Sequence, residues 1–163
     1  MFYFTADEHY GHAKIMGYCN RPFKDVEEMD SALIANHNRV VFPWDVTIHA
    51  GDFCWARKAE QAQKYIRQLN GSHIFLKGSH DSWLPASAKF MWHKVIEGQF
   101  VVVCHYAMRT WEGAHHGSWQ LYGHSHCTLP PIGKQMDVGV DGHNFTPWSW
   151  TEICQVLGEP NED

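Results

Sequence analysis

The sequence predicts an α/β fold with mixed β-sheets, and three observations support this prediction. In the first half of the 163-residue chain, short apolar runs alternate with segments of helical periodicity. In the second half, apolar runs follow one another before a final helical segment. An apolar content of 44% with 19% charged residues is typical of an ordered globular chain. Strands that first alternate with helices and then succeed one another favour an α/β fold with mixed sheets.

The first half of the chain supplies three strands with two helices between them. A polar loop with at most one helical turn follows the first strand. Asp25 is a suitable N-cap for the first helix, and Glu28 completes a capping box. Asn70 and Gly71 form a C-cap pair that ends the second helix. In order, we expect a strand at 1–6, a helix at 25–41, a strand at 46–50, a helix at 58–69 and a strand at 72–77.

The second half is dominated by strands. The pair Glu97-Gly98 is a strong hairpin signal, and Pro147 suits the first turn of the last helix. In order, we expect strands at 91–96, 99–104, 119–122 and 135–140, a polar loop at 107–118 and a helix at 146–156. The length fits a single domain over residues 1–157, followed by an acidic tail at 158–163.

Composition excludes several classes of protein. The net charge of −5 argues against a protein that binds duplex nucleic acid through its phosphates. Five cysteines, an odd number without a C-x-x-C pair, argue against a disulfide framework and against a thiolate zinc site. Neither a signal peptide nor an apolar stretch of membrane-spanning length is present in the sequence. We therefore expect a soluble cytoplasmic protein with no membrane partner.

Polar residues follow the ends of five predicted strands. Ligands of α/β proteins bind outside the carboxyl ends of strands, so these side chains are candidates for one common site. The spacing of two in Asp7-x-His9 and in His124-x-His126 would place each pair on one side of an extended backbone. The full set of strand-end residues is Asp7, His9, Asp52, Ser79, His80, Asp81, His105, His124 and His126.

The residue types in this set point to metal chemistry. Two carboxylates and four imidazoles suit Mn, Fe, Zn, Co or Ni better than Mg or Ca alone. A carboxylate such as Asp52 can bridge two cations. One histidine after a strand is usually only a hydrogen-bonded or surface residue. Six carboxylates and histidines at the ends of successive strands indicate a metal site.

At this point the sequence resembles the calcineurin-like metallophosphoesterases. Their signature runs D-x-H, G-D, G-N-H-[DE], H and G-H-x-H, and every block occurs here in order between residues 7 and 126. Arg21-Pro22-Phe23 and residues 36–41 resemble the small, capless phage and bacterial members. The blocks stand as Asp7-x-His9, Gly51-Asp52, Gly78-Ser79-His80-Asp81, His105 and Gly123-His124-x-His126.

The resemblance implies a four-layer α/β/β/α sandwich and a role for each matched residue. In the family, the residues at Asp7, His9 and His126 hold one metal and those at 79, His105 and His124 hold the second. The carboxylate at Asp52 bridges the two, and the bridging hydroxide attacks phosphorus. The resemblance further implies that His80 protonates the leaving oxygen or stabilises the developing charge, and that Asp81 orients His80 and keeps it charged.

One position departs from the family signature. Ser79 stands where the family has asparagine, whose carbonyl oxygen is a neutral ligand to the second metal. A serine hydroxyl is shorter and is a poorer donor to a cation. We therefore expect the second metal site to be weaker than in the family.

Substrate contacts are less specific in the sequence. Arg109 follows His105 in the same loop and could hold a phosphate oxygen, and His12 could line the mouth of the site. Trp55, Trp111 and Trp119 lie close in sequence to the metal-site blocks and could stack on a nucleobase. The competing interpretation of these residues is a solvated arginine, a surface histidine and core-packing tryptophans.

These features predict a phosphoesterase with two divalent cations, Mn in the first place. We expect it to hydrolyse a phosphodiester rather than a protein phosphate, and its substrate to be small and nucleotide-like. The first alternative is a metal-binding module with impaired catalysis, which the serine at position 79 favours. A second alternative is a mononuclear hydrolase that uses only Asp7, His9, Asp52 and His126.

Overall fold

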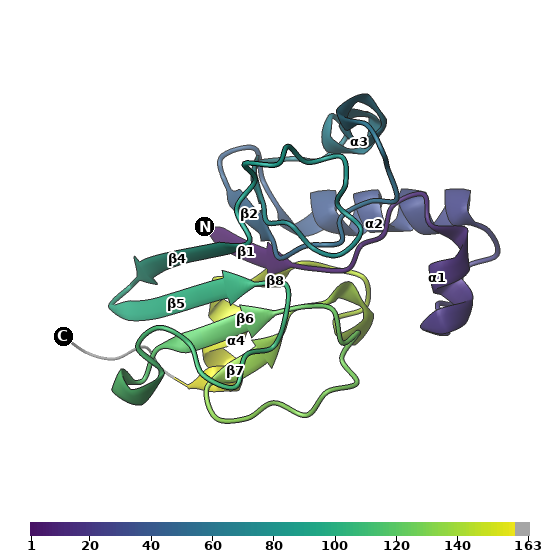
Figure 1. Ribbon diagram of the computed structural model, residues 1–163. Coiled ribbons are helices and arrows are strands. Elements are labelled where there is room, and N and C mark those ends of the chain that lie inside the picture. The colour runs from purple at the N-terminus through teal and green to yellow at the C-terminus, as the bar shows by residue number, and fades with distance from the viewer. Residues whose placement is uncertain (159–163) are drawn as a thin grey trace.

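The computed structural model describes residues 1–158 and contains two four-stranded β-sheets (Figure 1). In the first sheet β1, β2 and β3 are parallel and β8 is antiparallel, in the order β3-β2-β1-β8. In the second, β4 is antiparallel to β5, and β5, β6 and β7 are parallel. The strands are β1 Phe2–Thr5, β2 Val46–His49, β3 Ser72–Phe75, β4 Met91–Ile96, β5 Gln99–Cys104, β6 Trp119–Tyr122, β7 Gln135–Asp137 and β8 Trp148–Ser149. The predicted α/β class with two mixed sheets is confirmed.

Helices cover the sheets unevenly. The helices are α1 Ala13–Tyr18, α2 Val26–Val40, α3 Ala59–Ile66 and α4 Trp150–Leu157, with 3₁₀ turns at Ala114–His116 and Val140–Gly142. Asp25 caps α2 as predicted, because its side chain accepts a hydrogen bond from the Glu28 amide. None of the described helices is long and apolar enough to cross a membrane.

The sequence was misleading at two C-terminal elements. The strand expected at 135–140 ends at Asp137, because Val140 begins a 3₁₀ turn. The last helix begins at Trp150 rather than at 146, and Ser149 is its N-cap in a capping box with Glu152. Pro147 therefore precedes β8 and takes no part in the first turn of the helix. Residues 159–163 of the expected acidic tail lie outside the described residues.

The main core lies between the two sheets. Alternate side chains of the facing strands enter it, as the period of two requires. Helix α4 closes one side, where the rings of Trp119 and Trp150 lie 5.4 Å apart. The buried residues of this core include Phe4, Ile48, Val101, Val103, Trp119, Leu121, Trp150 and Ile153.

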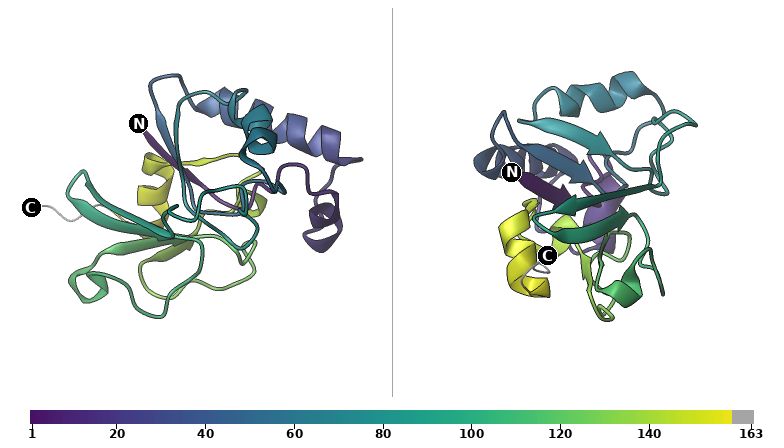
Figure 2. Two further views of the ribbon diagram at one scale, coloured as in Figure 1. Left: turned by 45° about the horizontal axis from the view of Figure 1, so that its top comes forward. Right: turned by 90° about the vertical axis from the view of Figure 1, so that its left-hand side faces the viewer.

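Outside the sandwich, the two faces are covered differently (Figure 2). Helices α2 and α3 pack on the first sheet through a second apolar cluster that includes Met29, Leu33 and Ala62. The outer face of the second sheet is covered by an irregular segment. There the side chain of Gln120 donates to the carbonyl of Tyr106 and accepts from the amide of Met108. The fourth layer is thus a loop with a short 3₁₀ turn.

The parallel strands deliver the candidate residues to one edge. Strands β1, β5 and β6 point the same way in Figure 1, and β2 and β3 run parallel to β1. The two sheets are joined at this edge, since Ala6 and Gly139 form a bridge just beyond β1. The segments that follow these strands can therefore meet.

Candidate metal centre

Of three groups of potential metal ligands among the described residues, two consist of the predicted residues, and the third consists of Cys19, His126 and Asp141. Asp7, His9 and His126 form the first group, and Asp52, His105 and His124 form the second. Within each group, one ligand atom from every residue lies within 4.8 Å of the others. The grouping agrees with the assignment that the family resemblance implies. It separates His124 from His126, although their spacing of two would place both on one side of an extended backbone.

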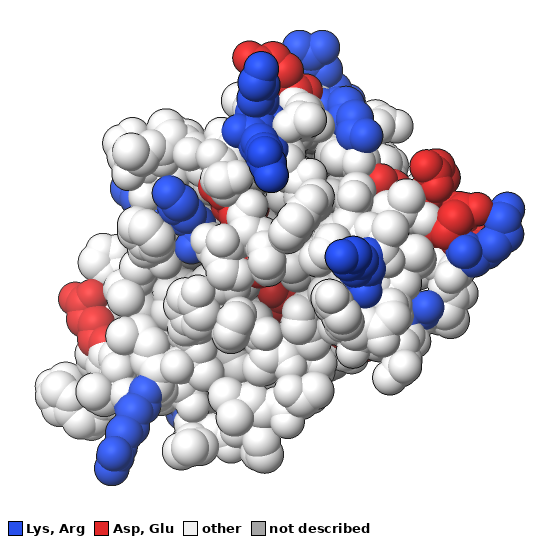
Figure 3. Space-filling view, turned by 45° about the vertical axis from the view of Figure 1, so that its right-hand side comes forward, with Lys and Arg blue, Asp and Glu red and all other residues white. Residues whose placement is uncertain are grey.

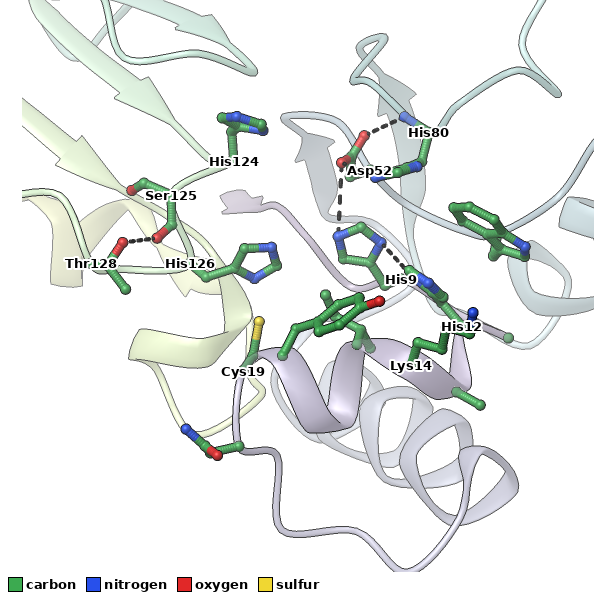
Figure 4. A pocket seen from close by; sticks show the side chains of 16 residues that line it. His9, His12, Lys14, Cys19, Asp52, His80, His124, Ser125, His126 and Thr128 are labelled. Carbon is green, nitrogen blue, oxygen red and sulfur yellow. Dashed lines mark hydrogen bonds and ion pairs between the residues drawn. The ribbon is translucent and has the colours of Figure 1, made fainter.

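The carboxylate of Asp52 lies close to a histidine of each group, and Figure 4 shows it beside His9 of the first. Its Oδ2 atom is 3.8 Å from Nε2 of His9 in the first group and 3.4 Å from Nε2 of His105 in the second. Its Oδ1 atom accepts a hydrogen bond of 2.8 Å from the backbone amide of His80. Burial alone would raise the pKa of Asp52, but its polar neighbours, His105 first, lower it below its ordinary range. One ionised oxygen can therefore face both groups.

Several ligand atoms are buried without a partner. Asp7 Oδ1, His9 Nε2 and His105 Nε2 have no hydrogen-bond partner among the described residues. His105 is oriented by the contact of its Nδ1 with the carbonyl of Ala50 at 3.0 Å, which leaves Nε2 as the acceptor atom. Buried polar atoms are normally paired. Three unpaired ligand atoms in the two groups are what we expect if these side chains bind cations.

Electrostatics supports the same interpretation. Burial raises the pKa of Asp7 well above its ordinary range, and the nearby carboxylates of Asp137 and Asp52 raise it further. Cations would offset this cost, since a bound ion is the largest local charge in such a site. Burial also lowers the pKa of His9 to about 3, so its ring is neutral at pH 7 and offers a lone pair. The residues present therefore fit two divalent cations.

The backbone at these ligands is left-handed rather than extended. The φ angles are 58° at Asp7, 55° at His9, 57° at Asp52, 69° at His124 and 47° at His126. Our expectation that the spacing of two acts through an extended strand is therefore wrong. Each strand ends before its ligand, and the chain turns. Such conformations cost roughly 1–2 kcal/mol per residue and cluster at functional sites.

Three glycines leave space for these turns. A Cβ atom on Gly78 would lie 2.2 Å from Asp52 Oδ1, and one on Gly51 would lie 2.6 Å from His105 Nδ1. A Cβ on Gly123 would lie 2.7 Å from Asp7 Oδ2. The glycines of the three motifs are therefore needed because the ligand side chains approach the backbone closely.

A Gly78→Ala variant tests this packing. The added methyl would also lie 2.5 Å from the Asp52 backbone nitrogen, which cannot move away as a flexible side chain could. We expect metal affinity to fall at least about tenfold, as when groups that orient ligands are disturbed. Calorimetric titration with Mn²⁺ measures this. Gly17→Ala is the matched control, because nothing lies within 4 Å of its added Cβ. Equal affinity in both variants would contradict the argument.

Asp81 has a different role from the expected one. Its carboxylate accepts hydrogen bonds from the amides of Asp52 (2.6 Å), Phe53 (3.0 Å) and Gly78 (2.9 Å), and from the indole of Trp83 (2.9 Å). None of these donors is the ring of His80, so Asp81 does not orient His80. It holds the turn that carries Asp52 against the turn that carries Gly78.

The candidate catalytic and hydroxyl residues lie beside Asp52. His80 Nε2 is 3.8 Å from Asp52 Oδ2, and 38% of the His80 side chain is exposed. The hydroxyl of Ser79 donates to the same Oδ2 atom at 2.9 Å. Ser79 is thus next to the second ligand group, where the resemblance places it. Its oxygen is engaged with the carboxylate.

A pocket of about 1040 Å³ opens above these residues (Figure 4). His9, Asp52, His80, His124 and His126 contribute to its lining. Acidic atoms are visible at the bottom of a hollow in Figure 3, within a mostly uncharged surface. Members of both ligand groups therefore border an open pocket.

Some of the proposed substrate-contact residues line the pocket and others do not. His12 lines the pocket, with its Nδ1 atom 3.5 Å from that of His9. Trp55 lines it too, whereas Trp119 is buried in the main core. Arg109 is exposed and is not among the residues that line the pocket, so the expected phosphate contact is not supported. The arginine lies on the loop that covers the second sheet.

Sequence reasoning missed a carboxylate behind the first group. Asp141 accepts a hydrogen bond of 2.7 Å from His126 Nδ1, which directs Nε2 away from it. Arg21 holds Asp141 with two bonds of 2.7 and 2.8 Å, and also donates to the backbone carbonyl of Asp7. Arg21 belongs to a motif noted in the sequence. Asp141 stands alone, 120 residues away, and no local pattern marks it.

Comparisons with known proteins place the chain in a family. No family model matches it. An uncharacterized protein of Methanocaldococcus jannaschii is 33% identical over 165 residues, which covers 95% of this chain and 90% of that protein. The chain belongs to the family of that archaeal protein.

Solved structures extend the likeness of the fold. A protein of unknown function from Aquifex aeolicus has a TM-score of 0.75 at 21% identity, covering 96% of this chain and 98% of its own. The two proteins therefore share a fold. A predicted phosphoesterase from Streptococcus pneumoniae has a TM-score of 0.45 at 14% identity over 82% of this chain and 67% of its own. That likeness is too weak to support an argument about function.

Proposed function

We propose that this protein is a metal-dependent phosphoesterase with two divalent cations. The observation that carries the proposal is the position of Asp52 Oδ2, which faces His9 of one ligand group and His105 of the other. A single carboxylate oxygen between two sets of imidazoles is the arrangement of a bridged two-metal site. The ordered motifs that resemble the calcineurin-like metallophosphoesterases support the same reaction.

In this proposal each side chain of the site has a separate role. Asp7, His9 and His126 would hold one cation, His105 and His124 would hold the other, and Asp52 would contact both. Manganese is the first candidate, because imidazole and carboxylate together suit it. When bound, the cations would supply Lewis-acid stabilisation of the phosphoryl group and activation of a water molecule. His80, partly exposed beside Asp52, is placed to give a proton to the leaving oxygen.

The proposed substrate is a small phosphoester, a diester in preference to a monoester. The pocket is wide, and both ester groups of a diester can be accommodated in about 1040 Å³. The net charge of −5 does not favour a long polyanion. A nucleotide-like molecule suits a pocket with aromatic rings in its wall.

Hydrolysis of bis-p-nitrophenyl phosphate and p-nitrophenyl phosphate tests the proposal. Protein stripped with a chelator should be inactive and should regain turnover as Mn²⁺ is added, with two equivalents bound. Binding of metal without hydrolysis of either ester would favour the impaired binding module, which the engaged hydroxyl of Ser79 makes the second candidate. Activity that saturates with one bound equivalent would favour the mononuclear alternative.

A Ser79→Asn variant is expected to strengthen the second metal site. Its amide oxygen would reach farther than the serine hydroxyl, which is now bonded to Asp52. We expect second-site affinity for Mn²⁺ to rise at least about tenfold, and turnover at limiting metal to rise with it. Titration followed by calorimetry and by turnover measures both. Ser79→Ala is the control and should not gain affinity. If the asparagine variant and wild type bind two equivalents equally well, residue 79 is not a ligand.

A further inference from the structure

The pocket wall contains an exposed indole, that of Trp55. Trp55 leaves 55% of its surface open, although it lies beside the metal groups. Its ring stacks on His12, with centroids 4.2 Å apart and planes at 16°. It also lies 5.0 Å from the ring of His80. An indole normally packs in a protein core. An exposed indole next to a candidate catalytic residue therefore indicates a surface that contacts a ligand.

The backbone holds this indole in place. The amide of Trp55 donates to the carbonyl of Tyr10 at 2.8 Å, and the amide of Tyr10 donates to the carbonyl of Phe53 at 2.9 Å. Tyr10 and Phe53 are both buried. The segment that carries Trp55 is therefore fixed to the segment that carries His9 and His12. A ring held in this way loses little freedom when a ligand stacks on it.

The rest of the wall is poor in charge. Lys14 is the one lysine or arginine among the described residues that line the pocket. Tyr18, on the same short helix, is 72% exposed and also lines it. Away from the metal groups the pocket thus offers rings rather than cations. This composition suits a substrate with one phosphate and a flat aromatic group, and it does not suit a polyphosphate.

We infer that Trp55, backed by His12, is a stacking platform for the base of a nucleoside phosphodiester. The inference rests on the proposed phosphoesterase function and names its substrate class. His80 lies between the platform and the metal groups, 5.0 Å from the Trp55 ring and 3.8 Å from Asp52 Oδ2. A phosphate at the metal groups would therefore have its nucleoside arm directed along the wall toward Trp55. Stacking tolerates any base, because every base has a π-face.

Two esters with the same leaving group isolate the contribution of the platform. Thymidine 5′-(p-nitrophenyl phosphate) carries a nucleoside arm, and methyl p-nitrophenyl phosphate carries none. In wild type, kcat/KM for the nucleoside ester should exceed that for the methyl ester. Trp55→Ala should lower the ratio of the two constants by a factor between about 5 and 150, the range that one stacked base contributes. Trp55→Phe should retain most of the ratio.

Trp44→Ala is the matched control. Trp44 is 76% exposed and stacks on Phe42, and it does not line the pocket. This variant should keep the wild-type ratio. A direct binding measurement accompanies the kinetics. By calorimetry with Mn²⁺ present, Trp55→Ala should bind adenosine monophosphate at least about fivefold more weakly than wild type, while inorganic phosphate binds equally to both.

The outcomes separate this inference from the function on which it rests. Hydrolysis of both esters with equal kcat/KM, or a ratio unchanged by Trp55→Ala, would overturn the platform and leave the phosphoesterase intact. Hydrolysis of neither ester by metal-loaded protein would overturn the proposed function, and the platform with it. A lowered ratio together with weaker binding of the nucleotide supports the inference.

Discussion

The Asp52→Asn variant is expected to lose at least about nine-tenths of its turnover, because a carboxylate shared by two cations contributes several kcal/mol. The lost charge is the one that lies 3.8 Å from His9 and 3.4 Å from His105. An amide of the same shape keeps the volume but faces both ligand groups without a negative charge. Turnover of bis-p-nitrophenyl phosphate at saturating Mn²⁺ measures the effect, and calorimetry counts the bound equivalents.

Asp25→Asn provides the matched control for the loss of one carboxylate. Asp25 caps helix α2 through the Glu28 amide, and asparagine caps helices about as well as aspartate. The control should keep its activity and its thermal stability. An Asp52→Asn protein that remains folded and retains more than about a tenth of wild-type turnover would show that Asp52 does not bridge two metals.

Replacement of His80 by alanine should lower kcat about 10²–10⁴-fold without changing the metal content. The ring is outside both ligand groups, yet it lies beside the carboxylate that faces them. The loss should shrink for esters with good leaving groups, since p-nitrophenolate needs little protonation as it departs. Alkyl phosphodiesters, whose alkoxide must be protonated, should suffer the full effect. Comparison of kcat for the two kinds of ester is therefore the informative measurement.

His93→Ala controls for the loss of an imidazole. His93 is exposed on β4, where its ring contacts the surface carboxylate of Glu112 and the ring of Phe100. It should leave both rates unchanged. Equal losses for aryl and alkyl esters in His80→Ala would contradict the role of general acid. A drop in bound metal would instead identify His80 as a residue that supports the ligand groups.

The candidate metal ligands could be selected from the sequence because they follow strand ends. A strand of four to six apolar residues is visible in sequence, and parallel strands place their carboxyl ends at one edge. The turns beyond those ends were not predictable in the same way. Asp7 and His9 adopt positive φ angles that depend on contacts made elsewhere, including the bond from the Asp7 amide to the carbonyl of Gly51. The spacing therefore suggested an extended backbone for these candidate ligands, whereas their backbone is left-handed.

Hydrogen-bond partners that are distant in sequence could not be predicted from the sequence. Asp81 follows His80 directly, yet its side chain turns to the amides of Asp52 and Phe53. Asp141 supports His126 from a segment with no motif of its own. Three tryptophans were equally suitable by sequence position as stacking residues for a nucleobase. Burial in the structure distinguishes the exposed Trp55 from the core residue Trp119. The partners of these side chains and the burial of each tryptophan depend on packing and hydrogen bonding between distant segments.

The hydrogen bonds between the N-terminal and C-terminal parts of the chain have a consequence for biosynthesis. Asp7 accepts a bond from the amide of His124, 117 residues later, and Arg21 reaches Asp141 across 120 residues. Contacts so distant in sequence close late in folding, because a long loop must first be ordered. A nascent chain that has not yet emerged as far as His124 contains neither complete ligand group. If the ligand groups bind cations as proposed, we expect a complete group to bind one only after at least the first 124 of the 163 residues have left the ribosome.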